Sequence, residues 1–305
     1  MSEVLDTTGE GREAAIARAA ELLQASRLVI VPTDTVYGIA ADAFDLDATA
    51  ALLTAKERDR DVPLPVLVRS PKQLPGIVAA VPAAAEQLIA AFWPGPLTLV
   101  LPAKGGLKWD LGRSDGVVSV RMPLDEVALE LIRSVGPLAV TAANAPGGEP
   151  PTTADQASAQ LGARVAAVLD DGPREEQQRS TIVDLTRSQP QVLREGAVPT
   201  ALVLDVAEGR VDPVEAAAVL AAAARDADHP QGAAATSGGT DQPGDADATE
   251  PADPAGPADA TEPADPATGG QPVGTEGAAS DEGAAAQRPL EGLERRGRDG
   301  RAGGK

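Results

Sequence analysis

The chain has 305 residues, with 46 acidic and 26 basic side chains, one His and no Cys, so a disulfide framework, a thiolate zinc site and a cysteine nucleophile are excluded. A net charge of −20 argues against nucleic-acid binding that depends on electrostatic attraction alone. Because no apolar run approaches the ~18 residues of a membrane span and the first residues lack a signal pattern, we predict a cytoplasmic protein without a membrane partner.

Short apolar runs alternate with amphipathic segments over residues 12–205, which predicts strands interleaved with helices. In chain order, we expect helices at 12–24, 47–55, 82–92, 125–133, 153–161 and 213–225, and strands at 28–31, 64–68, 97–102, 116–122, 138–141, 165–169, 181–185 and 191–194. Thr152 or Thr153 is expected to cap the helix at 153–161. The pattern indicates an α/β domain over residues 1–225, with its core at about 12–205.

The composition changes beyond that domain. Thirteen acidic residues and no Lys or Arg lie between Asp226 and Gln287, and the nonapeptide DATEPADPA occurs twice. Such a repeat has no hydrophobic face with which to offset the entropy of ordering. Residues 226–305 are therefore predicted to form a disordered, acidic C-terminal tail, with a partner-binding arm as the alternative.

Polar residues follow predicted strands at places where open α/β sheets bind ligands. The first group is the turn VPTDTVYG at 31–38, and the second contains Lys56, Arg58 and Arg60 at alternate positions. In an extended segment these three cations would lie on one side, with Glu57 on the other. Two arginines and a lysine could bind a polyphosphate, because guanidinium groups form bidentate hydrogen bonds to phosphate and the lysine adds a compact positive charge. The alternative is a charged loop exposed to solvent, which would have the same composition.

Two further groups contain arginine in or near an apolar strand. Arg121 lies within the otherwise apolar predicted strand GVVSVRM and requires an anionic partner there, which could be a structural carboxylate or a ligand. Ser180 directly precedes the predicted strand 181–185, and Arg194 is the last residue of the predicted strand 191–194. The sequence thus predicts one cavity in which five cations converge, namely Lys56, Arg58, Arg60, Arg121 and Arg194.

The common nucleotide-binding devices are missing from the sequence. Neither a GxxxxGK[ST] phosphate loop nor a GxGxxG segment after a strand is present. The one histidine, His229, lies in the predicted tail, which excludes an imidazole base and a Ser-His-Asp triad. Any catalysis must therefore depend on positioning and on charge stabilisation.

Seven motifs in this order resemble the YrdC-type threonylcarbamoyl-AMP synthases. They are PTDTVYGIAADA, KxR followed by PLPVLV, WPGPLTLVLP, VSVRMP, GPLAVTAAN, STIVDLT and VLREGAV, and they span about residues 12–205. The resemblance implies a twisted sheet flanked by helices with a concave basic cavity. It also implies the ATP-dependent synthesis of threonylcarbamoyl-AMP from L-threonine and bicarbonate with release of pyrophosphate, assisted by Mg²⁺. Partner proteins would then transfer the group to tRNA, which this chain would serve indirectly.

The resemblance also implies roles for individual residues. Lys56 and Arg58 match the KxR pair that handles the triphosphate and the carboxylated intermediate, so they are the candidate catalytic residues. The expected L-threonine contacts are Thr35, Arg121, Thr141 and Ser180, and the expected ATP contacts are Lys56, Arg58, Asn144, Thr152 and Arg194. The sequence does not identify the Mg²⁺ ligands.

Some positions depart from the family pattern. Ala142 replaces a usual Ser, Glu57 replaces a common Gly and would place a carboxylate among the cations, and Asp125 replaces a frequent His. The loops at 145–148 and 174–179 also differ. Two alternatives to the enzyme therefore remain, namely an RNA-binding YrdC-like module and a catalytically weakened paralogue that binds nucleotide.

Overall fold

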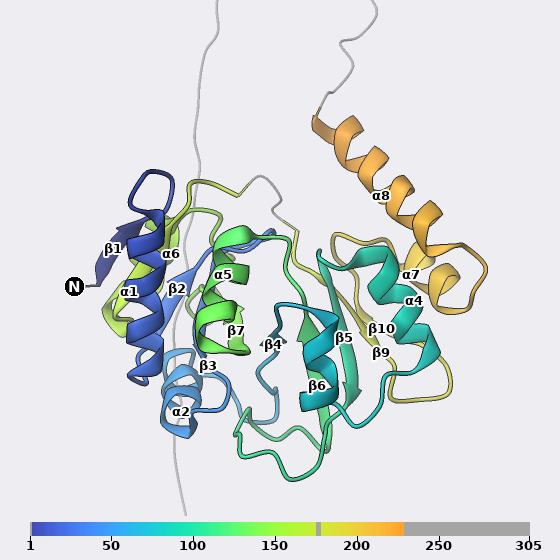
Figure 1. Ribbon diagram of the computed structural model, residues 1–305, viewed down its shortest axis with the longest axis horizontal. Helices are drawn as coiled ribbons and strands as arrows, with labels where there is room; N and C mark the ends of the chain where they lie inside the picture. Colours follow the sequence, from blue (N-terminus) through green and yellow to red (C-terminus); the bar gives the residue numbers. More distant parts are fainter. Residues whose placement is uncertain (1, 175–177, 229–305) are drawn as a thin grey trace, which may run out of the picture. The chain divides into compact units, whose positions relative to one another are not determined.

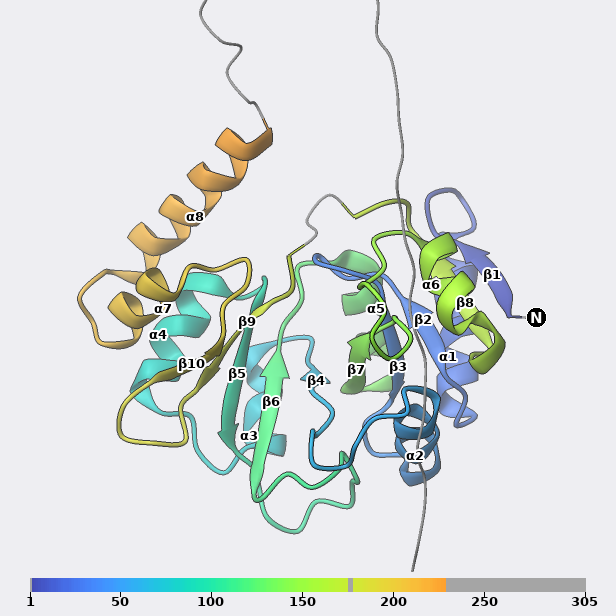
Figure 2. The same ribbon diagram turned by 180° about the vertical axis from the view of Figure 1, so that it is seen from behind.

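The computed structural model describes residues 2–174 and 178–228. These residues form a mixed sheet of ten strands in the order β1-β8-β2-β3-β7-β4-β6-β5-β9-β10, with helices on both faces (Figures 1 and 2). Parallel pairing joins β1 to β8, β8 to β2, β4 to β6 and β5 to β9, and the other neighbours are antiparallel. The predicted α/β class, a sheet flanked by helices, is confirmed.

The strands occupy most of the predicted apolar runs. They are β1 (Glu3–Asp6), β2 (Val29–Val31), β3 (Gly38–Asp42), β4 (Val66–Leu67), β5 (Leu97–Pro102), β6 (Val117–Arg121), β7 (Leu138–Ala142), β8 (Ala167–Asp170), β9 (Thr181–Asp184) and β10 (Gln191–Arg194). The sequence did not predict β1 or β3. Gly and Ala dominate β3 and favour strands poorly, so this segment is a strand because it is paired on both sides, with β2 and β7.

The helices also follow the predicted pattern closely. They are α1 (Arg12–Gln24), α2 (Leu46–Ala55), α3 (Leu74–Ile77), α4 (Ala83–Phe92), α5 (Glu126–Val135), α6 (Ala154–Leu161), α7 (Thr200–Ala207) and α8 (Pro213–Asp228), with short 3₁₀ segments η1 (Pro71–Gln73) and η2 (Gly162–Arg164). The helices α3 and α7 were not predicted. The last helix continues to Asp228, and the rest of the predicted tail, residues 229–305, lies outside the described residues.

Side-chain caps fix the first turns of three helices. The carboxylate of Asp45 accepts hydrogen bonds from the amides of Asp47 and Ala48 at the start of α2, and Asp125 caps α5 through the amide of Ala128. At α6 the cap is Thr153, whose hydroxyl accepts from the amide of Gln156 at 3.1 Å. This contact decides between the two capping threonines that the sequence left open.

Two apolar clusters fill the two faces of the sheet. Val29 and Val31 of β2 pack with α1 and α5 on one face, whereas Ile30 between them belongs to the larger cluster on the other face, with α2 and α6. This coverage of both faces explains why the strand is apolar throughout. At the far end of the sheet α4 packs against α7 and α8 (Figures 1 and 2).

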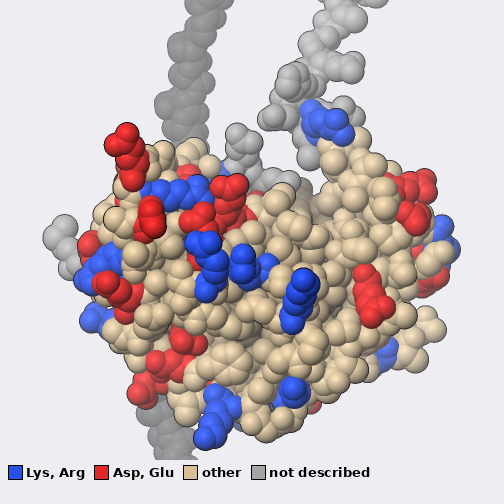
Figure 3. Space-filling view, viewed as in Figure 1, with Lys and Arg blue, Asp and Glu red and all other residues tan. Residues whose placement is uncertain are grey.

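Charged side chains of both signs are interspersed over α1 and α5 on the face shown in Figure 3. Arg12 pairs there with Glu126 and Glu130, and Arg18 pairs with Glu21 of its own helix. Such exposed pairs contribute little to stability. No helix within residues 2–174 and 178–228 is both long and apolar enough to cross a membrane.

Candidate active site

The cation pair Lys56 and Arg58 lies at a tight turn where α2 ends. The amide of Glu57 donates to Thr54 O and the amide of Arg58 donates to Leu53 O, both at 3.0 Å, which is the hydrogen-bond pattern of a Schellman motif. Glu57 takes the left-handed position of this motif, with φ 47°. The segment is therefore a turn, and the predicted extended conformation is wrong.

Lys56 and Arg58 both reach β7 and the residues that follow it. The Lys56 ammonium donates to the backbone oxygen of Asn144 and, at 3.2 Å, to its side-chain Oδ1. Burial, together with the charges of Arg58 and Arg164, lowers the pKa of Lys56 to about 8. The Arg58 guanidinium donates to Thr141 Oγ1 at 3.4 Å and to Val62 O at 2.7 Å, and burial lowers its pKa as well.

Two charges near this turn lie elsewhere than the sequence predicted. Arg60 is exposed and pairs with the Asp110 carboxylate, with Nη2 2.6 Å from Oδ1, so the prediction that it joins the other cations is wrong. Glu57 forms an ion pair with Arg164 at 2.8 Å. Among the described residues, its carboxylate is therefore paired with Arg164 and with neither Lys56 nor Arg58.

Arg121 is held by three neighbours at the end of β6. Because Val118 and Val120 belong to the larger apolar cluster, Arg121 projects from the opposite face of the sheet. Its Nε donates to Gly95 O at 3.0 Å, its Nη1 donates to Thr35 Oγ1 at 3.2 Å, and its Nη2 lies 2.6 Å from Asp34 Oδ1. The contact with Asp34 is an ion pair without hydrogen-bond geometry. Asp34 is thus the structural carboxylate that a buried Arg121 requires.

Ser180 and Arg194 contact each other at the far side of the sheet. The Arg194 Nη2 donates to Ser180 O at 2.8 Å and to Ser180 Oγ at 3.2 Å, and Ser180 Oγ lies 2.9 Å from Thr98 Oγ1 of β5. Burial lowers the pKa of Arg194, and the charges of Arg179, Arg121 and Arg58 lower it further. These cations from separate segments therefore share one neighbourhood, and a hollow of about 480 Å³ opens beside Arg179 and Arg194.

Asn144 and Thr152 belong to the segment between β7 and α6. The side-chain Nδ2 of Asn144 donates to Ala145 O at 3.0 Å and to Gly148 O at 2.8 Å. It therefore closes the loop at 145–148, which departs from the family pattern. The Thr152 hydroxyl donates to Gln156 Oε1 at 3.2 Å. In the described part of the chain, the Thr152 side chain makes no hydrogen bond to any of the cations.

The structure joins most of the predicted site residues in pairs. The pairs are Lys56 with Asn144, Arg58 with Thr141, Arg121 with Thr35 and Arg194 with Ser180. Sequence reasoning missed the neighbours that hold these residues, namely Asp34, Thr98 and Arg164. A signal existed for Thr98, because it is the only polar residue in the strand LTLVLP.

Two of the departures from the family pattern contact each other. Arg174 Nη1 lies 2.9 Å from the Asp125 carboxylate; the Asp125 side chain is buried and that of Arg174 is 12% exposed. The Arg174 guanidinium also bonds Asp171 at 2.8 Å and lies 5.4 Å from the centre of the Tyr37 ring. Burial raises the pKa of Asp125 in spite of its bond to the Ala128 amide and the charge of Arg174. Asp125 and Arg174 thus compensate for each other's charge.

Replacing Arg174 with methionine is expected to lower the free energy of unfolding by about 3–5 kcal/mol, because Asp125 would lose its counterion in a buried place. Urea denaturation measures this change. The double variant Arg174→Met with Asp125→Asn should recover most of the loss, since asparagine keeps the cap of α5 without the charge. A double variant as unstable as the single one would contradict this account.

Metal ions in proteins are bound by groups of acidic, histidine and cysteine side chains. No group of three or more that could bind a metal ion occurs in the part of the chain that the structure describes. These residues therefore do not form a Mg²⁺ site made of protein ligands alone.

Comparison with known proteins agrees with the motifs. The family model Sua5/YciO/YrdC, described as "Telomere recombination", matches residues 21–196. The chain is 52% identical over 207 residues to a putative threonylcarbamoyl-AMP synthase of Mycobacterium tuberculosis, covering 68% of this chain and 95% of the relative. It is 36% identical over 200 residues to the threonylcarbamoyl-AMP synthase of Pyrococcus abyssi, covering 65% of this chain and 59% of that one.

Solved structures show the same fold. P. abyssi Sua5 complexed with L-threonine matches with a TM-score of 0.65 and 34% identity, covering 67% of this chain and 61% of that chain. Escherichia coli YciO matches with a TM-score of 0.59 at 22% identity, covering 64% of this chain and 96% of that chain. At that identity the likeness to YciO concerns the fold alone.

Proposed function

The chain belongs to the Sua5/YciO/YrdC family, and on this premise we propose that it is a threonylcarbamoyl-AMP synthase. It would convert L-threonine, bicarbonate and ATP into threonylcarbamoyl-AMP and pyrophosphate, the first step of tRNA N6-threonylcarbamoyladenosine modification. The observation that carries the proposal is the shared neighbourhood of Arg58, Arg121 and Arg194, three cations from separate segments of an acidic chain. Cations so grouped stabilise the negative charges of a reacting triphosphate.

Arg121 is the proposed contact for the threonine carboxylate. A guanidinium has five N–H groups, and within the described residues three of them face Gly95 O, Thr35 Oγ1 and Asp34. A guanidinium binds a carboxylate through two parallel N–H groups, and Arg121 would bind the threonine carboxylate in this way. The hydroxyls of Thr35, Thr141 and Ser180 would complete the threonine site.

Lys56, Arg58 and Arg194 are the proposed contacts for the triphosphate, with Asn144 and Thr152 nearer the nucleoside. They would line the concave basic cavity of the family. Carbamate formation on threonine, followed by attack on the α-phosphate, requires oriented reactants and charge stabilisation. Both of these requirements can be met without a protein nucleophile. Mg²⁺ would enter with ATP, bound by phosphate oxygens as is usual for this ion.

Proteins that transfer the threonylcarbamoyl group to tRNA are the proposed partners that follow in the reaction sequence. The mixed anhydride between a carbamate and a phosphate is reactive, so its consumer must accept it directly. Because that consumer acts on tRNA, we place this chain in the cytoplasm.

A product assay tests the proposed function. We expect the full chain, given ATP, Mg²⁺, bicarbonate and L-threonine, to release pyrophosphate and an adenylate that contains threonine, with no product when threonine is omitted. ATP binding without product would instead identify a weakened paralogue. Salt-dependent tRNA binding without any turnover would identify an RNA-binding module.

A further inference from the structure

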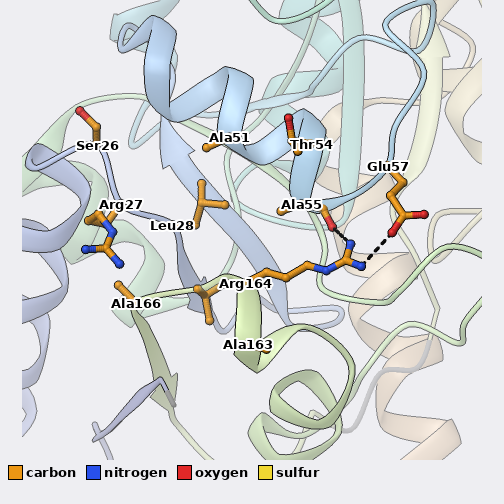
Figure 4. A pocket seen from close by; sticks show the side chains of 11 residues that line it. Ser26, Arg27, Leu28, Ala51, Thr54, Ala55, Glu57, Ala163, Arg164 and Ala166 are labelled. Atoms are coloured by element: carbon orange, nitrogen blue, oxygen red, sulfur yellow. Dashed lines mark hydrogen bonds and ion pairs between the residues drawn. The ribbon is translucent and has the colours of Figure 1, made fainter.

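A cavity of about 700 Å³ lies beside the C-terminal end of α2, away from the contacts of Arg121 and Arg194. Its wall includes Arg27, Ala55, Glu57 and Arg164 (Figure 4). Arg164 extends along this wall from η2, and both ends of its guanidinium are engaged (Figure 4). Nothing in the proposed chemistry uses this arginine, so its contacts call for an explanation.

The contacts of Arg164 are made with the turn that carries Lys56 and Arg58. Its Nη1 donates to the backbone oxygen of Ala55, the last residue of α2, and its Nη2 lies 2.8 Å from Glu57 Oε1. The last carbonyls of a helix have no partner within the helix, and a cation near them is favourable. A single side chain therefore binds the residues just before and just after Lys56.

The turn needs such support because of the residue at its centre. Glu57 has a left-handed φ of 47°, a conformation that glycine adopts freely and a residue with a side chain adopts at a cost. Glycine is the common choice at this position of a Schellman motif. With glutamate there, Arg164 supplies two contacts in the conformation that the backbone disfavours. One is the hydrogen bond to Ala55 O, and the other is the ion pair with Glu57, which is itself exposed, with 42% of the Arg164 side chain and 59% of the Glu57 side chain accessible.

We propose that Arg164 is a positioning residue, which holds the α2 turn through Ala55 O and the Glu57 carboxylate so that Lys56 and Arg58 both face the triphosphate. This inference rests on the proposed function, because it takes Lys56 and Arg58 as the ATP contacts. Arg164 acts on Lys56 by charge as well. The groups that face the Lys56 ammonium are the cations Arg58 and Arg164 and the neutral acceptor Asn144, and both cations disfavour its protonated form.

Replacing Arg164 with glutamine tests the proposal. The apparent kcat/KM for ATP should fall by about tenfold to 100-fold, because a small displacement of catalytic groups has effects of this size. The KM for L-threonine should stay near its value in the unmodified chain. Arg27→Gln is the matched control, since Arg27 lies on the same cavity wall and is exposed, and it should leave both constants unchanged.

Glycine at position 57 provides a rescue. In the Arg164→Gln background, Glu57→Gly should restore most of the kcat/KM for ATP, because glycine adopts the turn without a supporting ion pair. Unchanged kinetics in Arg164→Gln would overturn the proposal. A kinetic loss that Glu57→Gly fails to restore would overturn the role of Arg164 in holding the turn.

A measurement that does not need turnover separates this proposal from the proposed function. In protein labelled with ¹³C at lysine Cε, with the Lys56 signal identified from a Lys56→Met variant, Lys56 should titrate near pH 8. In Arg164→Gln it should titrate at higher pH, because one positive charge is gone. An unmoved titration would overturn the proposal. A chain without any product would overturn the proposed function, while this titration would still test whether Arg164 acts on Lys56.

Discussion

Replacing Arg121 with methionine is expected to lower the kcat/KM for L-threonine by about 100-fold or more, which corresponds to about 3 kcal/mol of lost charge pairing. Arg121 is the buried cation proposed to bind the substrate carboxylate. The same change leaves the Asp34 carboxylate buried without a counterion, which should reduce the free energy of unfolding by about 3–5 kcal/mol. Steady-state kinetics and urea denaturation measure the two effects separately.

A double variant distinguishes binding from folding. Arg121→Met combined with Asp34→Asn removes both charges, so most of the stability should return. The kcat/KM for L-threonine should remain as low as in the single variant, because the guanidinium proposed to bind the threonine carboxylate is still absent. If activity returns together with stability, Arg121 serves only to neutralise Asp34, and its proposed role in binding threonine is wrong.

Sequence periodicity was sufficient for the fold where both faces of a strand are covered. Leu97–Pro102 and Leu138–Ala142 are apolar apart from one threonine each, Thr98 and Thr141, and were predicted almost to the residue. The strand Gly38–Asp42 was missed, because its glycine and alanines have no strand preference of their own and its two neighbours impose the conformation. Tertiary pairing of this kind leaves no mark in a local pattern.

The site was predictable in its residue types and less so in its geometry. An arginine at the end of the apolar strand VVSVR demands an anion, and the structure supplies Asp34. The cations at 56, 58 and 60 have the spacing of one face of a strand, yet the chain turns at Glu57. Sequence reasoning could not foresee this, because glutamate is a poor choice for a left-handed position and the contact that stabilises it comes from Arg164, far along the chain.

That turn produces the second large prediction, which compares two arginines two positions apart. Arg58 is half-buried and reaches Thr141 on β7, whereas Arg60 is exposed and pairs with Asp110. Arg58→Ala should therefore lower the kcat/KM for ATP by about 100-fold or more, since it removes a preorganised cation from the developing charge. Arg60→Ala removes the same formal charge from the same segment and should change the rate less than about twofold, because exposed pairs contribute little.

The pair of variants also tests how the site uses charge. If the cluster acts through its total positive potential, the two substitutions should lower kcat/KM by similar factors. Both losses should then become smaller at high salt, because exposed charges are screened. If it acts through positioned contacts, only Arg58→Ala is impaired, and added salt does not restore it. The structure favours the second outcome, because burial and the turn at Glu57 place Arg58 near Arg194 and leave Arg60 in solvent. Equal losses in both variants would contradict the assignment of Arg58 to the site.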